Sequence, residues 1–453
     1  MKVTRRQLVQ AGLATSLAPA IRGGTSRLPN IVLLMSDDQS QPHLGCYGDP
    51  VVRTPNIDRL AAEGVRFTGC FVASPQCSPN RSAIFTGCTP HTTATSRLHT
   101  PMPPWEWTFL EGLKDKGYFV GAFRKVHQGE QFNKRWDFYG DAGTSFERFF
   151  QALPRGRPFF LQFGSTDPHR PYPSGTAQSV HDPSRVPVPA FLPDTPEVRQ
   201  DLARYYDAIA RFDTECGELM DLLRRYGFAE NTMVVVTSDN GMPFPRAKGT
   251  CYDPGIRVPL IVWWPERVKG GRVVDELISH VDLPATWLDV AGVRPPEKMQ
   301  GRSFLGLLLG REYHKRDAVF AERNWHDNFD PIRCVRTERW KLIFNAAPHF
   351  PYRPAWDIED SPSWAALKRE QRRGTLARHH LQLFEPSRPM LELYDLKNDP
   401  NEFHNLATDP AHADVLHELM RKLSDWMHDT YDFLPPAFAR PGEPAGRNWP
   451  TSL

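Results

Sequence analysis

Two pairs of residues with oxygen-bearing side chains directly follow short apolar stretches of the chain. Asp37 and Asp38 come after one stretch, and Asp239 and Asn240 come after another. Ca²⁺ and Mg²⁺ prefer carboxylate and amide oxygens, whereas zinc prefers Cys and His. Taken alone, either pair is more typical of a turn or a helix cap. Taken together, the four residues are a candidate site for one hard divalent cation.

A cysteine-containing segment between these pairs changes the interpretation. Residues 74–87 read SPQCSPNRSAIFTG, with the core Cys77-x-Pro79-x-Arg81 followed by an apolar stretch and a Thr-Gly pair. This segment resembles the sulfatase signature, in which a formylglycine-generating enzyme oxidises the cysteine to formylglycine. Further segments occur in the order found in that family, and the resemblance covers nearly the whole chain. They are Lys125-Val126-His127, Asp167-Pro168-His169-Arg170 and Ser238-Asp239-Asn240-Gly241.

Two stretches narrow the resemblance to one branch of the family. Residues 237–245 and 393–410 are similar to the N-sulfoglucosamine sulfohydrolases, or sulfamidases. The single residue between Lys125 and His127 also fits, because many O-sulfatases have one more residue there. Two positions depart from this branch: Thr166 stands where a further His is found, and Lys248 stands near an arginine. Lys248 keeps the positive charge.

The resemblance implies a role for each matched residue. The implied Ca²⁺ ligands are Asp37, Asp38, Cys77, Asp239 and Asn240, and Mg²⁺ remains an alternative because it takes similar donors. The implied catalytic residues are Cys77, Arg81, Lys125, His127, His169 and Lys248.

In this scheme hydrated formylglycine at position 77 attacks sulfur, with one hydroxyl acidified by the metal and Arg81. His127 then helps to expel sulfate, and His169 donates a proton to the leaving amine, with Lys248 as the alternative acid. Arg170 and His326 are candidate substrate contacts, although Arg170 is equally suited to ordering its own loop.

The elements that must position these residues are short apolar strands that alternate with helices. Such alternation predicts an α/β fold, a large and mostly parallel sheet with helices on both faces. The resemblance implies the alkaline-phosphatase-like version of this fold. The predicted strands are 30–36, 65–67, 118–123, 158–163, 232–238 and 260–264, and the predicted helices are 56–64, 107–116 and 201–226.

The pattern changes near residue 311. Residues 318–322 are expected to form a last strand of the large domain, and residues 332–344 alternate like an antiparallel hairpin. A strand at 391–396 and an amphipathic helix at 412–431 complete a smaller α+β domain with an antiparallel sheet. The predicted division is a signal peptide at 1–26, a catalytic domain at 27–330 and a smaller C-terminal domain at 331–453.

The N-terminus predicts export. Arg5 and Arg6 precede a mildly apolar stretch, and Ala18-Pro19-Ala20 is typical of a cleavage site, as in twin-arginine signals. The protein is therefore expected to be periplasmic or extracellular. Beyond this signal the chain lacks the 18 or more apolar residues of a membrane span. With 55 Lys+Arg against 53 Asp+Glu, the net charge of +2 gives no basic surface for nucleic acid.

Three classes of function follow from these residues. The leading hypothesis is the removal of N-linked sulfate from glucosamine in heparan-type saccharides. The alternative is an O-sulfatase, or a phosphomonoester or phosphonate hydrolase on the same scaffold. A glycan-binding protein without activity is disfavoured, because the whole catalytic set is present. The resemblance also makes a homodimer plausible.

Overall fold

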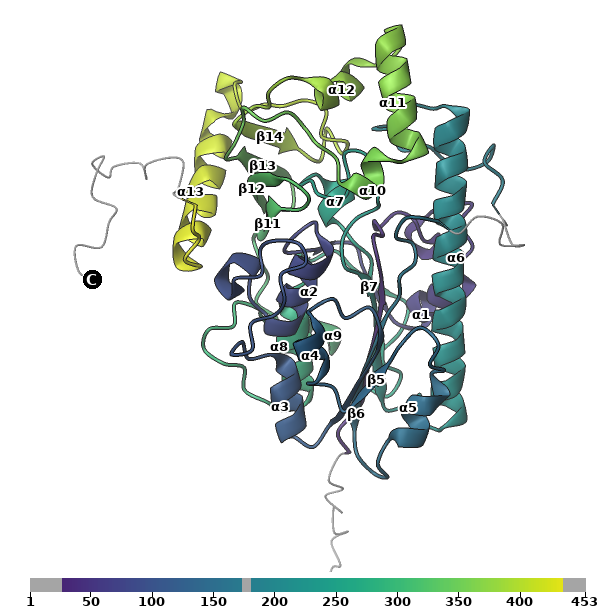
Figure 1. Cartoon of the computed structure of the whole chain (residues 1–453). Coiled ribbons are helices and arrows are strands. Elements are labelled where there is room, and N and C mark those ends of the chain that lie inside the picture. The colour runs from purple at the N-terminus through teal and green to yellow at the C-terminus, as the bar shows by residue number, and fades with distance from the viewer. Residues whose placement is uncertain (1–26, 173–180, 435–453) are drawn as a thin grey trace, which may run out of the picture.

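The computed structural model describes residues 27–172 and 181–434, and its central feature is an eight-stranded sheet (Figure 1). The predicted signal peptide lies outside the described residues. In spatial order the strands are β5 (Phe138–Gly140), β4 (Phe119–Arg124), β6 (Phe159–Gly164), β1 (Asn30–Ser36), β7 (Thr232–Ser238), β8 (Leu260–Trp263), β2 (Val65–Phe67) and β9 (Arg272–Val274).

The sheet is mostly parallel, as the alternation of strands and helices predicts. Strands β5, β4, β6, β1 and β7 all run in the same direction. Strand β8 runs antiparallel to both of its neighbours, β7 and β2. Two further strands, β3 (Cys70–Phe71) and β10 (Ile278–Ser279), form a separate parallel pair.

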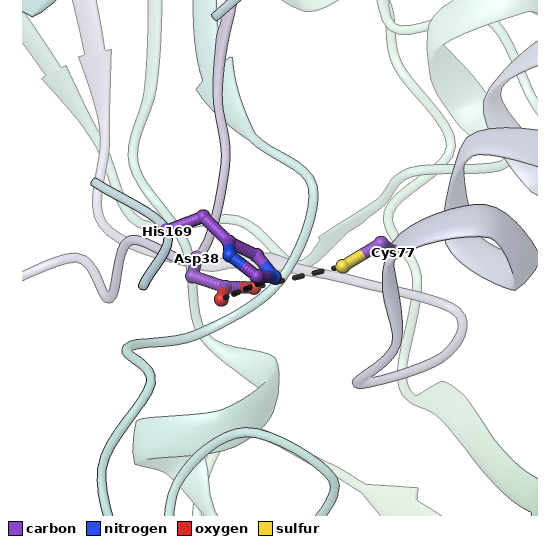
Figure 2. A group of neighbouring side chains, drawn as sticks. All are labelled: Asp38, Cys77 and His169. Atoms are coloured by element: carbon purple, nitrogen blue, oxygen red, sulfur yellow. Dashed lines mark hydrogen bonds and ion pairs between the residues drawn. The ribbon is translucent and has the colours of Figure 1, made fainter. Parts of the chain in front are cut away.

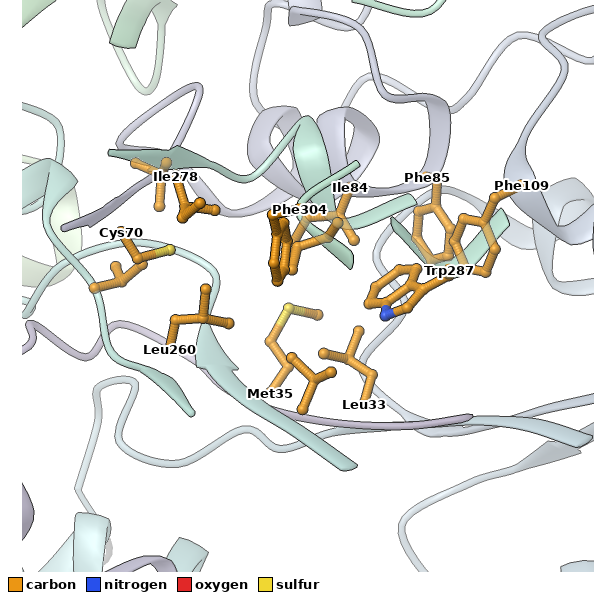
Figure 3. Close-up of a cluster of buried hydrophobic side chains, with 14 of the residues drawn as sticks. Leu33, Met35, Cys70, Ile84, Phe85, Phe109, Leu260, Ile278, Trp287 and Phe304 are labelled. Atoms are coloured by element: carbon orange, nitrogen blue, oxygen red, sulfur yellow. The ribbon is translucent and has the colours of Figure 1, made fainter. Parts of the chain in front are cut away.

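Helices cover both faces of the large sheet because alternate residues of its buried strands point to opposite sides. Leu33 and Met35 of β1 pack with α2 (Cys77–Thr86), α3 (Phe109–Asp115) and α8 (Asp282–Val290), as Figure 3 shows. Val32 and Leu34 face the other layer, which contains α1 (Pro55–Glu63), α5 (Glu147–Ala152) and α6 (Pro196–Arg225). Shorter helices are α4 (Glu130–Asn133), α7 (Asp253–Ile256) and α9 (Leu305–Leu308).

A second, antiparallel sheet contains four strands in sequence order. These are β11 (Val319–Trp325), β12 (Phe329–Arg336), β13 (Trp340–Asn345) and β14 (Leu391–Asp395). One face packs against the apolar side of α13 (Ala413–Asp429). The remaining helices are α10 (Trp356–Glu359), α11 (Pro362–Arg373) and α12 (Arg378–Leu381), and α11 packs against α6.

The second sheet corrects one expectation. Residues 318–322 do not extend the large sheet, because β11 pairs antiparallel with β12 from Val319↔Arg336 onward. The predicted hairpin at 332–344, the strand at 391–396 and the C-terminal helix are confirmed. The domain boundary at residue 330 stays a prediction. Within residues 27–172 and 181–434, the structure contains no helix with the length and apolar character needed to span a membrane.

Candidate active site

Neighbouring parallel strands of the large sheet end at one edge, and polar residues follow them there. Lys125 comes directly after β4, Asp37 and Asp38 come after β1, and Asp239 comes after β7. The pairing of β1 and β7 is in register to their last residues, Ser36 and Ser238. The two acidic segments are therefore side by side, and this edge is where α/β sheets bind their ligands.

Three carboxylates and one thiol form the centre of the site. Asp37, Asp38, Cys77 and Asp239 are all buried, and each has a ligand atom within 4.8 Å of the others. Asn240 joins this group because its Nδ2 donates to Asp38 Oδ1 at 2.7 Å. Figure 2 shows Asp38 and Cys77 together with His169, which comes from the loop after β6.

Two oxygens at this centre have no hydrogen-bond partner in the described part of the chain. Asp37 Oδ1 and Asn240 Oδ1 are buried without a hydrogen-bond partner among the residues that the structure describes. Buried polar atoms are normally paired, so two such oxygens in one cluster require an explanation. A hard divalent cation explains them, because its preferred ligands are oxygens of these two kinds. The residues present therefore fit a bound Ca²⁺.

Cys77 is the first residue of α2, and its local sequence explains this position. Gln76 before it is extended, Pro79 fits the first turn of a helix, and Gly87 ends α2 with a φ of 69°. Cys77 Sγ lies 3.7 Å from Asp38 Oδ1, so the helix start points this side chain at the carboxylates. Burial raises the pKa of the Cys77 thiol, which disfavours the nucleophilic thiolate.

Arg81, one helical turn after Cys77, links the two acidic segments to the strand end of β4. Its Nε donates to Asp239 Oδ2 at 2.8 Å, and its Nη1 donates to the carbonyl oxygen of Lys125 at 2.7 Å. Its Nη2 lies 3.7 Å from Asp37 Oδ1. The side chain is completely buried, so its charge depends on these contacts.

Two lysines place positive charge beside the carboxylates. Lys125 Nζ donates to Asp37 Oδ2. Lys248 Nζ donates to Asp38 Oδ2 at 2.7 Å and to Asp357 Oδ2 at 2.8 Å. Burial lowers the pKa of Lys248, but the two carboxylates outweigh it and raise that pKa above its usual value. Burial raises the pKa of Asp37, but Lys125, His169 and Arg81 together outweigh burial and bring that pKa below its usual value.

Two histidines lie next to these charged groups and have different surroundings. His127 Nε2 lies 2.7 Å from His99 Nδ1. Burial, together with Lys125, lowers the pKa of His127 to about 2, so this imidazole is neutral. His169 Nε2 lies 3.1 Å from Lys248 Nζ and 3.7 Å from Asp38 Oδ2.

Comparison with known families agrees with this arrangement. Residues 29–293 match the family model described as Sulfatase, which is more than half of the chain. The chain belongs to the sulfatase family. Residues 247–363 of this sulfatase also match the model described as N-sulphoglucosamine sulphohydrolase, C-terminal.

Individual relatives extend over most of this sulfatase. Human N-sulphoglucosamine sulphohydrolase is 30% identical, with 90% of this chain and 91% of the human protein covered. An ulvan-active sulfatase of Formosa agariphila is 29% identical, with 88% of this chain and 74% of that protein covered. A solved structure described as a complex with its substrate D-glucosamine-2-N,6-O-disulfate has a TM-score of 0.70 at 20% identity. It covers 91% of this chain and 100% of its own. The predicted family and fold are thus confirmed.

The two candidate substrate contacts have different positions in this sulfatase. Arg170 donates through Nη1 and Nη2 to the carboxylate oxygens of Asp201 at 2.7 Å each, and through Nε to the Pro243 carbonyl oxygen at 2.8 Å. The structure does not bring Arg170 into the carboxylate cluster, and its contacts order the loop instead. His326 Nδ1 lies 2.8 Å from Asp327 Oδ2, at the end of β11.

The sequence did not predict two features of the site. One is Asp357, and the other is the contact of His99 with His127. Asp357 lies in α10 and reaches Lys248 from a segment that no sulfatase motif marks. His99 was interpreted as a possible substrate contact or, more simply, as an ordinary loop histidine, and its contact with His127 was not predicted. Their roles depend on contacts between segments that are distant in the sequence.

Proposed function

We propose that this sulfatase removes N-linked sulfate from glucosamine residues of heparan-type saccharides. The similarity to the human sulfamidase over 90% of the chain supports this substrate. The match of residues 247–363 to the C-terminal model of that enzyme adds support, because this region supplies both Lys248 and Asp357. Cys77 is the residue that a formylglycine-generating enzyme would modify.

The metal and the modified residue occupy defined places in this proposal. Asp37, Asp38, Asp239 and Asn240 would hold Ca²⁺, together with residue 77. When present, Ca²⁺ supplies positive charge for the sulfate oxygens, and formylglycine supplies the nucleophile. The two buried oxygens that have no hydrogen-bond partner among the described residues support the metal, and the distance of 3.7 Å between Cys77 Sγ and Asp38 Oδ1 supports the place of residue 77.

Side chains of this sulfatase bind the sulfate and transfer the protons in this proposal. The Lys125 and Lys248 amines bind sulfate oxygens and offset their negative charge. The neutral His127 imidazole accepts a proton at the nucleophile. An amine leaves only after it gains a proton, and His169 donates that proton, because its Nε2 lies at the centre of the site, 3.1 Å from Lys248 Nζ and 3.7 Å from Asp38 Oδ2.

Replacing His127 with glutamine is expected to lower kcat by about 10²- to 10⁴-fold, since one proton acceptor is lost. With its pKa lowered to about 2, wild-type His127 stays neutral at every pH used in an assay. In a plot of kcat against pH, the fall in kcat on the acid side should therefore have the same midpoint in the variant as in the wild type. His404→Gln, whose side chain is 81% exposed, is the control. Loss of this fall on the acid side would show that His127 itself titrates there.

The substrate is tested by measuring sulfate release from N-sulfoglucosamine and from glucosamine 6-O-sulfate side by side. The protein is produced with and without a formylglycine-generating enzyme, and the mass of the peptide that contains residue 77 is measured in each sample. We expect release from the N-sulfated sugar, and only in the sample that contains formylglycine.

Other outcomes separate the alternatives. Release of sulfate from the O-sulfated sugar alone would agree with the proposed mechanism and show that the proposed substrate is wrong. If confirmed formylglycine gave no release from either sugar, phosphate or phosphonate monoesters would become the leading substrates. We further propose that the protein is exported, because residues 1–26 have the character of a twin-arginine signal. A homodimer stays a prediction.

A further inference from the structure

Helix α10 brings a second-domain carboxylate to the sulfate-binding lysine. Asp357 Oδ2 accepts a hydrogen bond from Lys248 Nζ at 2.8 Å. The other oxygen, Asp357 Oδ1, is buried and has no hydrogen-bond partner in the described part of the chain. Asp357 therefore pairs with the lysine through one oxygen and leaves an acceptor available through the other.

Asp327 links His326 to the start of α10, the helix that carries Asp357. Asp327 Oδ2 lies 2.8 Å from His326 Nδ1 and also accepts a hydrogen bond from the backbone N–H of Trp356 at 2.8 Å. Because Trp356 directly precedes Asp357, one oxygen holds both the imidazole and the start of α10. His326 Nε2 is buried and is likewise unpaired within the ranges that the structure covers, and the His326 side chain is 6% exposed.

Asp357 Oδ1 and His326 Nε2 do not belong to the carboxylate cluster that is proposed to bind Ca²⁺. Asp357 is linked to Asp38 through Lys248, whose Nζ donates to one oxygen of each carboxylate. One carboxylate and one imidazole are too few donors for a second hard cation. His326 Nδ1 donates to the Asp327 carboxylate, so His326 Nε2 is an acceptor like Asp357 Oδ1. Two neighbouring hydroxyls of a sugar can satisfy both groups, because each hydroxyl donates one hydrogen bond. Buried polar groups with no protein partner can hydrogen-bond a ligand and so fix its orientation in the site.

We propose that Asp357 and His326 form a hydroxyl-binding subsite for the sugar ring that carries the scissile sulfate. This inference rests on the proposed function, which makes the substrate an N-sulfated glucosamine. Asp357 Oδ1 accepts a hydrogen bond from the hydroxyl next to the sulfated nitrogen, the 3-hydroxyl, and His326 Nε2 accepts one from the neighbouring 4-hydroxyl. A sulfate at that position removes the donor and adds negative charge against the carboxylate, so Asp357 rejects 3-O-sulfated glucosamine.

The test compares kcat/KM for N-sulfoglucosamine with kcat/KM for glucosamine N,3-O-disulfate. A site that hydrogen-bonds a substrate hydroxyl discriminates strongly against analogues that lack the donor, so the wild-type ratio should be about 10² or more. Asp357→Asn removes the charge with little change in size. We expect this variant to lower the ratio at least tenfold, chiefly through a higher KM for the monosulfated sugar and a lower KM for the disulfated sugar.

Two variants serve as controls. Glu359→Gln changes an exposed carboxylate of the same short helix and should leave the ratio unchanged. His326→Gln should raise KM for the monosulfated sugar without restoring hydrolysis of the disulfated sugar. If Asp357→Asn lowered kcat equally for both sugars and kept the ratio, Asp357 would act solely by holding Lys248, and the subsite would be overturned. Melting temperatures confirm that each variant is folded.

Failure of the proposed function is distinguishable from failure of the subsite. If wild-type protein hydrolysed the 6-O-sulfate and not the N-sulfate, the proposed substrate would be wrong. The ratio would then be measured for glucosamine 6-O-sulfate against the 4,6-disulfate, since the 4-hydroxyl is next to that sulfate along the ring. If Asp357→Asn also left the kcat/KM ratio of these two sugars unchanged, the subsite would be excluded for both substrates.

Discussion

Replacing Cys77 with alanine is expected to abolish sulfate release and to leave the fold intact. The loss should be about 10⁶-fold in kcat, the scale seen when a covalent nucleophile is removed. Alanine keeps the start of α2 and removes one buried sulfur, whose hydrogen bond is the long contact to Asp38 Oδ1 at 3.7 Å. The free energy of unfolding should therefore change by about 1 kcal/mol or less.

A second buried cysteine provides the matched control for this experiment. Cys216 is fully buried in α6, in the helix layer that covers the other face of the sheet. Cys216→Ala should keep wild-type kcat while losing a similar amount of packing. Activity is measured as sulfate release and stability by urea unfolding of the same samples. If Cys77→Ala retained more than a hundredth of wild-type activity, the nucleophile would have to be another group.

Replacing Arg81 with methionine should produce the largest loss of stability. Removing one partner of a buried ion pair leaves an uncompensated charge, which costs about 3–5 kcal/mol. Arg81 is completely buried and contacts Asp239 at 2.8 Å and Asp37 at 3.7 Å, so its loss leaves two carboxylates short of positive charge. Activity should fall as well, because the same contacts join Asp239 to the end of β4.

The effect of Arg81→Met is measured by urea unfolding at neutral pH. Arg59→Met on the exposed side of α1 is the control and should change the free energy of unfolding by about 0.5 kcal/mol or less. Added Ca²⁺ should recover part of the stability lost by Arg81→Met, because a cation bound to the remaining carboxylates favours the folded state. A variant as stable as wild type without Ca²⁺ would show that the Arg81 pairs contribute nothing net.

Strands and helices were predictable wherever local patterns decide them. The apolar run of β1 and the β-branched run of β7 are buried on both faces, so their composition marks them as central strands. The hairpin of β12 and β13 was visible from its alternation. The direction of β8 and the sheet that β11 joins were not predictable in this way. The direction of β8 depends in part on β2, which is distant in the sequence, whereas β11 pairs with the next strand, β12, and a short strand carries no local mark of the sheet that it joins.

The sequence alone determined the residues that lie next to strand ends and at the start of α2. Asp37, Asp239 and Lys125 come together because parallel neighbouring strands end at one edge, and this follows once the strands are identified. The tertiary structure decided which groups complete the site. Arg170 pairs with Asp201, and Asp357 reaches Lys248, across loops with no shared motif. Such contacts depend on where separate elements pack, and packing is a property of the whole chain and not of any local segment.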